Sequence, residues 1–116
     1  MLETYEETVV PAVRGSETLL ESALKAGPQL ESVVVTSSTI AVTNPKDEPG
    51  YTFTESDFAS AALDRAIKER GTGVRTPGGV LYGASKTAAE RAVWKFRDEH
   101  KARFFLFSLK NWRREI

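Results

Sequence analysis

The sequence predicts an α/β fold in which two parallel strands are flanked by helices. Two short apolar runs, Val33–Val35 and Arg103–Leu109, have no polar alternation, as in parallel strands covered on both faces. Between and before them lie longer segments whose apolar residues recur about every 3.6 positions, as in helices that bury one side. This order of helix, strand, helices and strand indicates right-handed crossover connections.

The first helix is expected over residues 3–27, where a Gly-Pro step ends the periodic pattern. Pro11 is tolerated best in a first turn, so the helix either begins near Val9 or is kinked there. Gly15 lies in the helix interior, where glycine costs about 1 kcal/mol relative to alanine. Its presence indicates close packing on a neighbouring element.

Residues 43–56 are expected to form a loop, followed by a short helix over 58–70 that Thr54 or Ser56 caps. The glycine-rich stretch 71–79 is interpreted as a connector. A long helix is then expected from Tyr82 to about His100. Its inward side carries Ala88, Ala89, Ala92, Val93 and Phe96, and its outward side carries Glu90, Arg91, Lys95, Arg97 and Asp98.

The composition excludes several classes of protein. Sixteen basic and sixteen acidic residues cancel, so no net field favours nucleic acid or an anionic membrane. Without cysteine, and with His100 as the one histidine, neither a disulfide scaffold nor a zinc site is expected. No apolar run reaches the roughly 18 residues of a membrane span, and the acidic N-terminus lacks a signal-peptide pattern. A cytoplasmic protein of one domain, or part of one, is expected.

Two groups of residues suggest chemistry. Tyr82 and Lys86 lie one helical turn apart, where the ammonium favours the ionised phenol and lets it exchange a proton. This spacing also occurs by chance, as an exposed lysine beside a half-buried aromatic. The hydroxyl cluster 36–39 follows the first strand at its carboxyl end, where ligands bind in open α/β sheets. The alternative for that cluster is a turn that bonds its own backbone.

Together these segments resemble the extended short-chain dehydrogenase/reductase family, above all its dihydroflavonol-reductase-like and fungal carbonyl-reductase branch. NAD-dependent epimerase/dehydratases are broader relatives. The match covers about residues 5 to 107 and is carried by Val10–Gly27, Val33–Ser38, the Tyr82–Lys86 YxxxK motif and its extension to Glu90. The resemblance implies a partial Rossmann-type, doubly wound fold over residues 1–109, with 110–116 as a tail outside the family pattern.

The resemblance also implies roles for individual residues. Tyr82 would be the general acid that protonates a carbonyl oxygen, and Lys86 would hold the nicotinamide ribose and assist the phenol. Ser38 would hydrogen-bond the substrate oxygen, and Thr36 and Ser37 would lie near the cofactor. The cofactor is expected to be NADP or NAD, with NADPH favoured.

The substrate class implied is a small ketone or aldehyde, or the corresponding alcohol. Thr39 beside the strand end, and Phe53 and Phe58 in the excursion that follows, would line its pocket. No metal is expected. The resulting interpretation is an NAD(P)-dependent oxidoreductase of the carbonyl-reductase type, acting on CH–OH groups.

Three departures from the family pattern stand out. The chain contains no GxGxxG turn for a dinucleotide pyrophosphate. The last apolar run leads into Ser108–Ile116 in place of the family's usual turn, and Thr18 stands where the family often has an asparagine. We therefore expect a truncated form that lacks the N-terminal dinucleotide-binding half and binds the cofactor weakly. Open sheet edges would make it weakly stable, self-associating or dependent on a homologous partner.

Three alternatives are kept. One is a non-catalytic interaction protein derived from such an enzyme, and another is a nucleotide-sugar epimerase or dehydratase using the same residues. A third is a nucleic-acid contact through Trp112-Arg113-Arg114, although a frayed amphipathic tail is favoured there. Partners of the nucleic-acid or membrane class are not expected.

Overall fold

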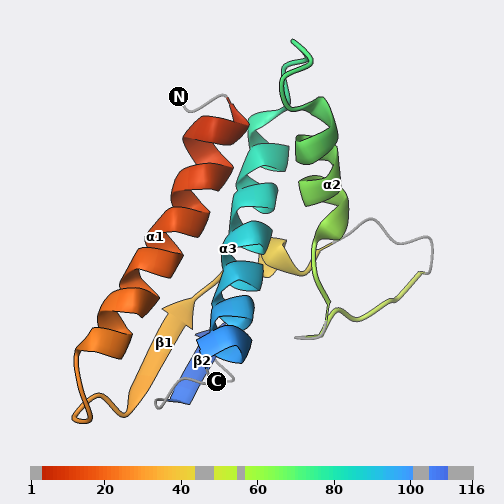
Figure 1. Cartoon of the computed structure of the whole chain (residues 1–116). Coiled ribbons are helices and arrows are strands. Elements are labelled where there is room, and N and C mark those ends of the chain that lie inside the picture. Colours follow the sequence, from red (N-terminus) through yellow and green to blue (C-terminus); the bar gives the residue numbers. More distant parts are fainter. Residues whose placement is uncertain (1–3, 44–48, 55–56, 101–104, 110–116) are drawn as a thin grey trace.

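A computed structural model of the chain describes residues 4–43, 49–54, 57–100 and 105–109. Its elements in order are α1 (Tyr5–Lys25), β1 (Ser32–Thr36), the short 3-10 helix η1 (Thr39–Ala41), α2 (Ser60–Glu69), α3 (Gly78–His100) and β2 (Phe105–Leu109). Helix α3 lies between α1 and α2, and the two strands lie beside the lower halves of α1 and α3 (Figure 1). Most of the described chain is therefore helical.

The strands β1 and β2 pair in parallel, with Ser32 opposite Phe105 and Thr36 opposite Leu109. A parallel pair requires a crossover connection, which the chain between them, with α2 and α3, provides. The first residues of the expected second strand, 103–104, and the tail 110–116 with its Trp-Arg-Arg sequence lie outside the described residues. So do the side chains of β2.

One face of β1 is covered and the other is open. Val33 and Val35 pack against a core formed by Leu20 of α1 and by Val93 and Phe96 of α3. The intervening valine, Val34, is 56% exposed. The expectation of a strand covered on both faces is wrong for the described part of the chain, because α1 and α3 pack on the same face.

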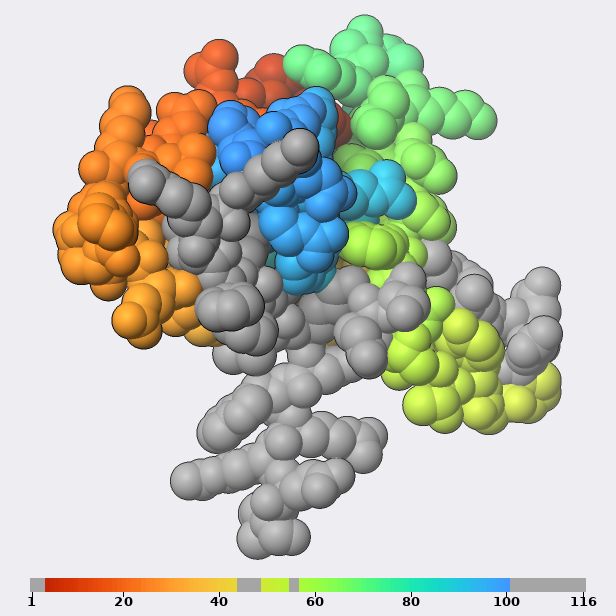
Figure 2. Space-filling view, turned by 60° about the horizontal axis from the view of Figure 1, so that its bottom comes forward, coloured from red at the N-terminus to blue at the C-terminus, as the bar shows by residue number. Residues whose placement is uncertain are grey.

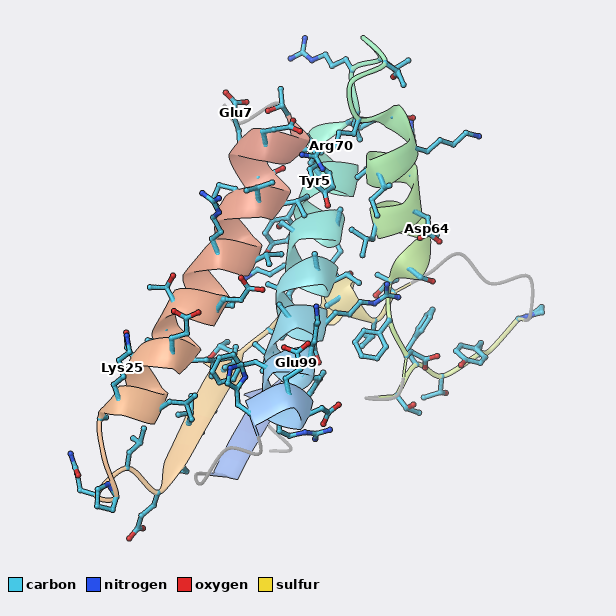
Figure 3. The ribbon with its side chains drawn as sticks, in the orientation of Figure 1. Tyr5, Glu7, Lys25, Asp64, Arg70 and Glu99 are labelled. Carbon is cyan, nitrogen blue, oxygen red and sulfur yellow. The ribbon has the colours of Figure 1, made fainter. Side chains whose placement is uncertain are left out.

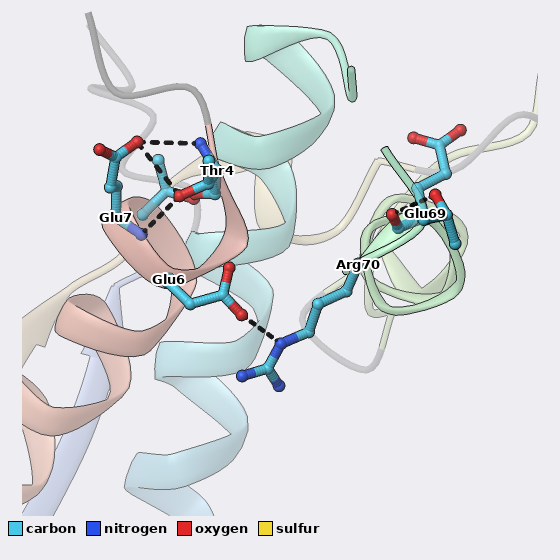
Figure 4. Close-up of polar contacts among 7 residues, drawn as sticks. Thr4, Glu6, Glu7, Glu69 and Arg70 are labelled. Atoms are coloured by element: carbon cyan, nitrogen blue, oxygen red, sulfur yellow. Dashed lines mark hydrogen bonds and ion pairs between the residues drawn. The ribbon is translucent and has the colours of Figure 1, made fainter. Parts of the chain in front are cut away.

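A capping box starts α1. The Thr4 hydroxyl accepts a hydrogen bond from the Glu7 N–H at 3.2 Å, and the Glu7 carboxylate accepts one from the Thr4 N–H at 3.2 Å (Figure 4). Because this cap satisfies the first donors, α1 begins at Tyr5 and holds Pro11 inside the helix. The alternative that the helix begins near Val9 is wrong.

At Gly15, α1 does not pack closely against another described element. Among the described residues, no atom of another element lies within 4 Å of the position that a Cβ would occupy, and the residue is exposed. The expected packing on a neighbouring element is wrong. We expect Gly15→Ala to stabilise the chain by about 1 kcal/mol, because alanine removes a helix-propensity penalty without a clash. The urea unfolding midpoint measures this change.

Gly71 provides the matched control. It also has open space around it, but its φ of +72° is one that residues with a Cβ adopt only at a cost. Gly71→Ala should therefore destabilise the chain by about 1 kcal/mol. A Gly15→Ala variant that unfolds at lower urea than the parent would contradict this interpretation of the helix.

Among the described residues, a carboxylate organises the loop before α2. The N-cap residue of α2 is Ala59, which has no side-chain cap, so the expectation that Thr54 caps this helix is wrong. Instead the Asp57 carboxylate accepts hydrogen bonds from the Thr54 N–H at 2.8 Å and the Tyr51 hydroxyl at 2.9 Å. Ser56, the other expected cap, lies outside the described residues. The loop forms a lobe beside the helices (yellow-green in Figure 2).

Helix α3 begins four residues before Tyr82. The Pro77 carbonyl accepts hydrogen bonds from the Val80 and Leu81 N–H groups at 3.0 and 3.1 Å. The last glycines of the expected connector are therefore helical, and Gly78 is the first residue of α3. As a result Tyr82 lies inside a regular helix, where its spacing from Lys86 places both on one face.

An ion pair joins the upper ends of α1 and α2. The Arg70 guanidinium donates a hydrogen bond to the Glu6 carboxylate and lies 4.5 Å from the centre of the Tyr5 ring (Figures 3 and 4). This hydrogen bond lowers the pKa of Glu6. The neighbouring Glu69 also has a lowered pKa, because its carboxylate accepts hydrogen bonds from the Thr76 hydroxyl and from Arg65.

Candidate active site

Tyr82 and Lys86 are neighbours on α3. The Lys86 Nζ atom lies 5.9 Å from the centre of the Tyr82 ring. Tyr82 is 49% exposed, whereas Lys86 is partly buried. Within the described residues no carboxylate pairs with the Lys86 ammonium. The turn thus presents an accessible phenol beside an ammonium that has no acidic partner there.

Ser38 lies at the start of η1, which packs on the same part of α3. Its hydroxyl accepts a hydrogen bond from the Ile40 N–H at 3.3 Å, and its carbonyl accepts one from the Ala41 N–H at 3.0 Å. A Cβ added to Gly83 would lie 3.5 Å from the Ile40 side chain. That distance is an ordinary van der Waals contact, so the short helix that follows Ser38 packs directly against this turn of α3.

A cavity of about 210 Å³ opens between α1, the carboxyl end of β1 and α3. It is lined by Ala12, Ser16, Val35, Thr36, Ser37, Ser85, Lys86, Ala89 and Glu90. The structure thus brings three of the residues expected near a cofactor or in catalysis, Thr36, Ser37 and Lys86, to one cavity. Ser38, which follows Ser37, and Tyr82, which lies one helical turn before Lys86, are not part of this lining.

Glu90 is buried, and sequence reasoning missed it. Only 2% of it is exposed, so the expectation that it points outward is wrong. Its Oε2 accepts a hydrogen bond from the Ser37 hydroxyl at 2.8 Å, and its Oε1 accepts one from the Trp94 indole N–H at 3.3 Å. Its spacing of four residues from Lys86 and from Trp94 places it beside both on the helix surface, but this spacing does not by itself indicate burial.

Comparison with known proteins gives this arrangement a context. No family model matches the chain. Aldehyde reductase 2 of Sporidiobolus salmonicolor is 37% identical over 103 residues, and tetraketide alpha-pyrone reductase 1 of Arabidopsis thaliana is 35% identical over 96. These matches cover 88% and 82% of this chain. The structure of yeast methylglyoxal/isovaleraldehyde reductase complexed with NADPH matches 95% of the chain, with a TM-score of 0.75 and 27% identity.

The chain is related to the reductases of the extended short-chain dehydrogenase/reductase family. It spans 29% of the Sporidiobolus reductase, 26% of the Arabidopsis reductase and 31% of the yeast structure. The chain therefore corresponds to between a quarter and a third of the length of these reductases.

The residues expected to form the substrate pocket of a reductase lie apart from the cavity. The Phe58 ring lies 5.5 Å from the guanidinium carbon of Arg91 on α3, and Phe58 is not among the residues that line the cavity. Phe53 stacks edge-to-face on Tyr51 in the loop, with ring centres 5.1 Å apart. Thr39, in η1, is exposed. The structure does not bring these three residues to the cavity that Lys86 lines, and their role stays a prediction.

Two further properties bear on the class of site. Among the described residues, no group of acidic and histidine side chains is arranged to hold a metal ion. In the same part of the chain, none of the helices has the length and apolar character needed to cross a membrane.

Proposed function

We propose that this chain carries the Ser-Tyr-Lys catalytic segment of an NAD(P)-dependent carbonyl reductase that converts small aldehydes or ketones into alcohols in the cytoplasm. One observation carries the proposal. The Lys86 ammonium lies at a cavity one turn from the exposed Tyr82 phenol, and among the described residues no carboxylate lies within ion-pair distance of it. A cation held in this way is available to a ligand and to the phenol. The relationship to aldehyde and methylglyoxal reductases supports the choice of reaction.

The donors at the cavity fit the ribose of a nicotinamide nucleotide. Lys86 contributes three N–H donors, and the Thr36 hydroxyl can both donate and accept. A cavity of about 210 Å³ has the size of one sugar or ring rather than of a whole dinucleotide. The sequence has no GxGxxG turn to bind a pyrophosphate. We therefore infer that this chain by itself binds a dinucleotide weakly, and we favour NADPH because the yeast relative's structure contains it.

The chain's own residues would handle the proton. A bound nicotinamide nucleotide would supply the hydride. Tyr82 would donate its phenolic proton to the carbonyl oxygen as negative charge develops there, and the Lys86 ammonium would stabilise the phenolate that is left. The Ser38 hydroxyl would donate a hydrogen bond to the same oxygen.

A charge-removing variant tests the cofactor part of this proposal. Replacing Lys86 with methionine keeps the aliphatic stem but removes hydrogen bonds from a charged donor, each worth about 1.5–3 kcal/mol. NADPH binding, followed by NMR titration of the Thr36 and Ser37 amides, should weaken by about tenfold or more. Lys95→Met is the control, because Lys95 is an exposed lysine of the same helix paired with Glu99. Equal affinities for parent and Lys86→Met would contradict the assignment.

A second candidate function rests on β1. Among the described strands its one partner is β2, and Val34 on its open face is 56% exposed. A strand edge with free backbone groups pairs readily with another chain. The chain could thus act without catalysis, by adding its strands to a homologous reductase. Light scattering of a mixture with a longer homologue would detect such a complex. A chain that stays monomeric and does not bind the homologue would rule out this function.

A further inference from the structure

Glu90 is a buried acidic side chain that the proposed reaction does not use. A carboxylate that is 98% buried is costly unless its oxygens accept hydrogen bonds. The adjacent positions of the same helix hold Ala89 and Arg91, and Val93 fills the core one turn later. An apolar residue at position 90 would satisfy packing without that cost. The acid is therefore expected to serve a geometric purpose.

The hydrogen bond from Ser37 to Glu90 differs from those of the other serines at the cavity. The Ser16 hydroxyl donates to the Ala12 carbonyl at 2.9 Å, and the Ser85 hydroxyl donates to the Tyr82 carbonyl at 2.7 Å. Both bonds stay within one helix. The Ser37 hydroxyl, by contrast, reaches from the end of β1 to α3 and joins residues 53 positions apart. It is the bond of the three that fixes one element against another.

The strand end that this bond fixes leads directly to the predicted catalytic serine. Ser37 immediately precedes Ser38, whose carbonyl and hydroxyl hold the first turn of η1. That turn packs on Gly83 and continues to the Ala59 N–H, which donates to the Ala41 carbonyl at 2.6 Å. A shift of Ser37 along α3 would therefore carry Ser38 away from the turn that holds Tyr82.

We propose that Glu90 is a positioning residue that fixes the carboxyl end of β1 on α3 through Ser37, and so sets the place of Ser38 relative to Tyr82. The Trp94 indole N–H holds the second carboxylate oxygen and orients the acid toward Ser37. The hydrogen bond from Ser37 to Glu90, which ties β1 to α3, does not depend on the proposed function. Its catalytic consequence does. Its loss should lower kcat more than it raises KM, because it moves a group that acts on the developing charge.

Hydrogen exchange of backbone amides tests the tie without any turnover. In Ser37→Ala, the Ala41 and Val42 amides of the η1 turn should exchange roughly tenfold faster, the effect of losing one hydrogen bond to a charged group. The amides of Leu20 and Val93, in the core helices, should change less than about threefold, because local opening differs from global unfolding. Ser16→Ala is the matched control: it removes a serine hydroxyl from the same cavity and should leave η1 exchange unchanged.

Glu90→Gln provides a second variant that keeps the side-chain volume. Its amide can accept from Trp94 while donating to the Ser37 oxygen, so the tie is weakened rather than lost. Exchange at Ala41 should lie between the parent and Ser37→Ala, and the Trp94 indole N–H resonance should shift. Unchanged η1 exchange in both variants, or a uniform rise across η1 and the core helices, would overturn the proposal. If amide exchange in the variants rises only at η1 but the parent chain has no reductase activity, the structural role of the Ser37–Glu90 hydrogen bond is upheld and its catalytic consequence is overturned.

Discussion

Reduction of a small aldehyde by this chain is expected to fall by about two to four orders of magnitude when Tyr82 is replaced by phenylalanine, the usual contribution of a positioned general acid. The substitution removes one oxygen and leaves the ring beside Lys86. Because Tyr82 is 49% exposed, the loss of its hydroxyl opens no buried cavity and should not change stability. The effect would therefore report on proton donation.

The control for this experiment is Tyr51→Phe. Tyr51 is also a partly exposed tyrosine, at 38%, but its hydroxyl donates to Asp57 in the loop and is remote from the cavity. NADPH consumption with a panel of aldehydes, at equal protein concentration, compares the variants. Activity of Tyr82→Phe within about threefold of the parent would remove Tyr82 from the chemistry.

The second large effect concerns stability. Leu20 is fully buried and packs against Val93 and Phe96, where α1, α3 and β1 meet. Leu20→Ala should lower the free energy of unfolding by about 2–5 kcal/mol, from the lost burial and the cavity left behind. Single domains are stable by only about 5–15 kcal/mol, so the variant should be largely unfolded at moderate urea.

Its neighbour Leu19 offers a matched control, because the same substitution there removes a side chain that is 60% exposed. Leu19→Ala should change the free energy of unfolding by less than about 0.5 kcal/mol. Circular dichroism during urea unfolding measures both variants. Equal losses in the two would mean that α1 does not bury the face that the structure gives it.

The helices could be predicted from the sequence because their signals are local. Apolar periodicity placed α1, α2 and α3, and valine-rich or phenylalanine-rich runs placed β1 and β2. The helix ends were predicted less well. The Thr4–Glu7 capping box starts α1 despite Pro11, and the Pro77 carbonyl draws two glycines into α3. The Thr4-x-x-Glu7 pattern is a capping-box sequence that sequence reasoning missed, whereas the bonds to the Pro77 carbonyl depend on backbone geometry that the sequence does not specify.

The burial of particular residues could not be predicted, because it depends on partners far along the chain. Glu90 was expected in solvent, as charged residues usually are, but its acceptor oxygens meet Ser37, 53 positions away. Gly15 was expected in a tight contact, yet none of the described elements comes within 4 Å of the place a Cβ would take. Both outcomes follow from the tertiary arrangement and not from the local pattern.

In the candidate site, too, the features that depend on local sequence could be predicted, and those that depend on the tertiary arrangement could not. Tyr82 and Lys86 lie on one helix, so their spacing alone predicts that they are neighbours, which the structure bears out at 5.9 Å from Nζ to ring centre. The approach of the Ser38 turn to α3 depends instead on the fold of the intervening loop, and in the structure the Ile40 side chain of that turn lies against Gly83. For Phe53 and Phe58, their order in the chain did not predict how far they lie from the cavity. The structure places them in or beside the loop lobe.

The most direct test of the central claim is hydride transfer by the chain itself. NADPH carrying deuterium at its transferable position would be mixed with a small aldehyde and a high concentration of the chain, and the alcohol product analysed by mass spectrometry. The proposed function predicts an alcohol that carries one deuterium, formed by the parent and absent with Tyr82→Phe. Deuterated alcohol no more abundant than in a protein-free mixture would contradict it.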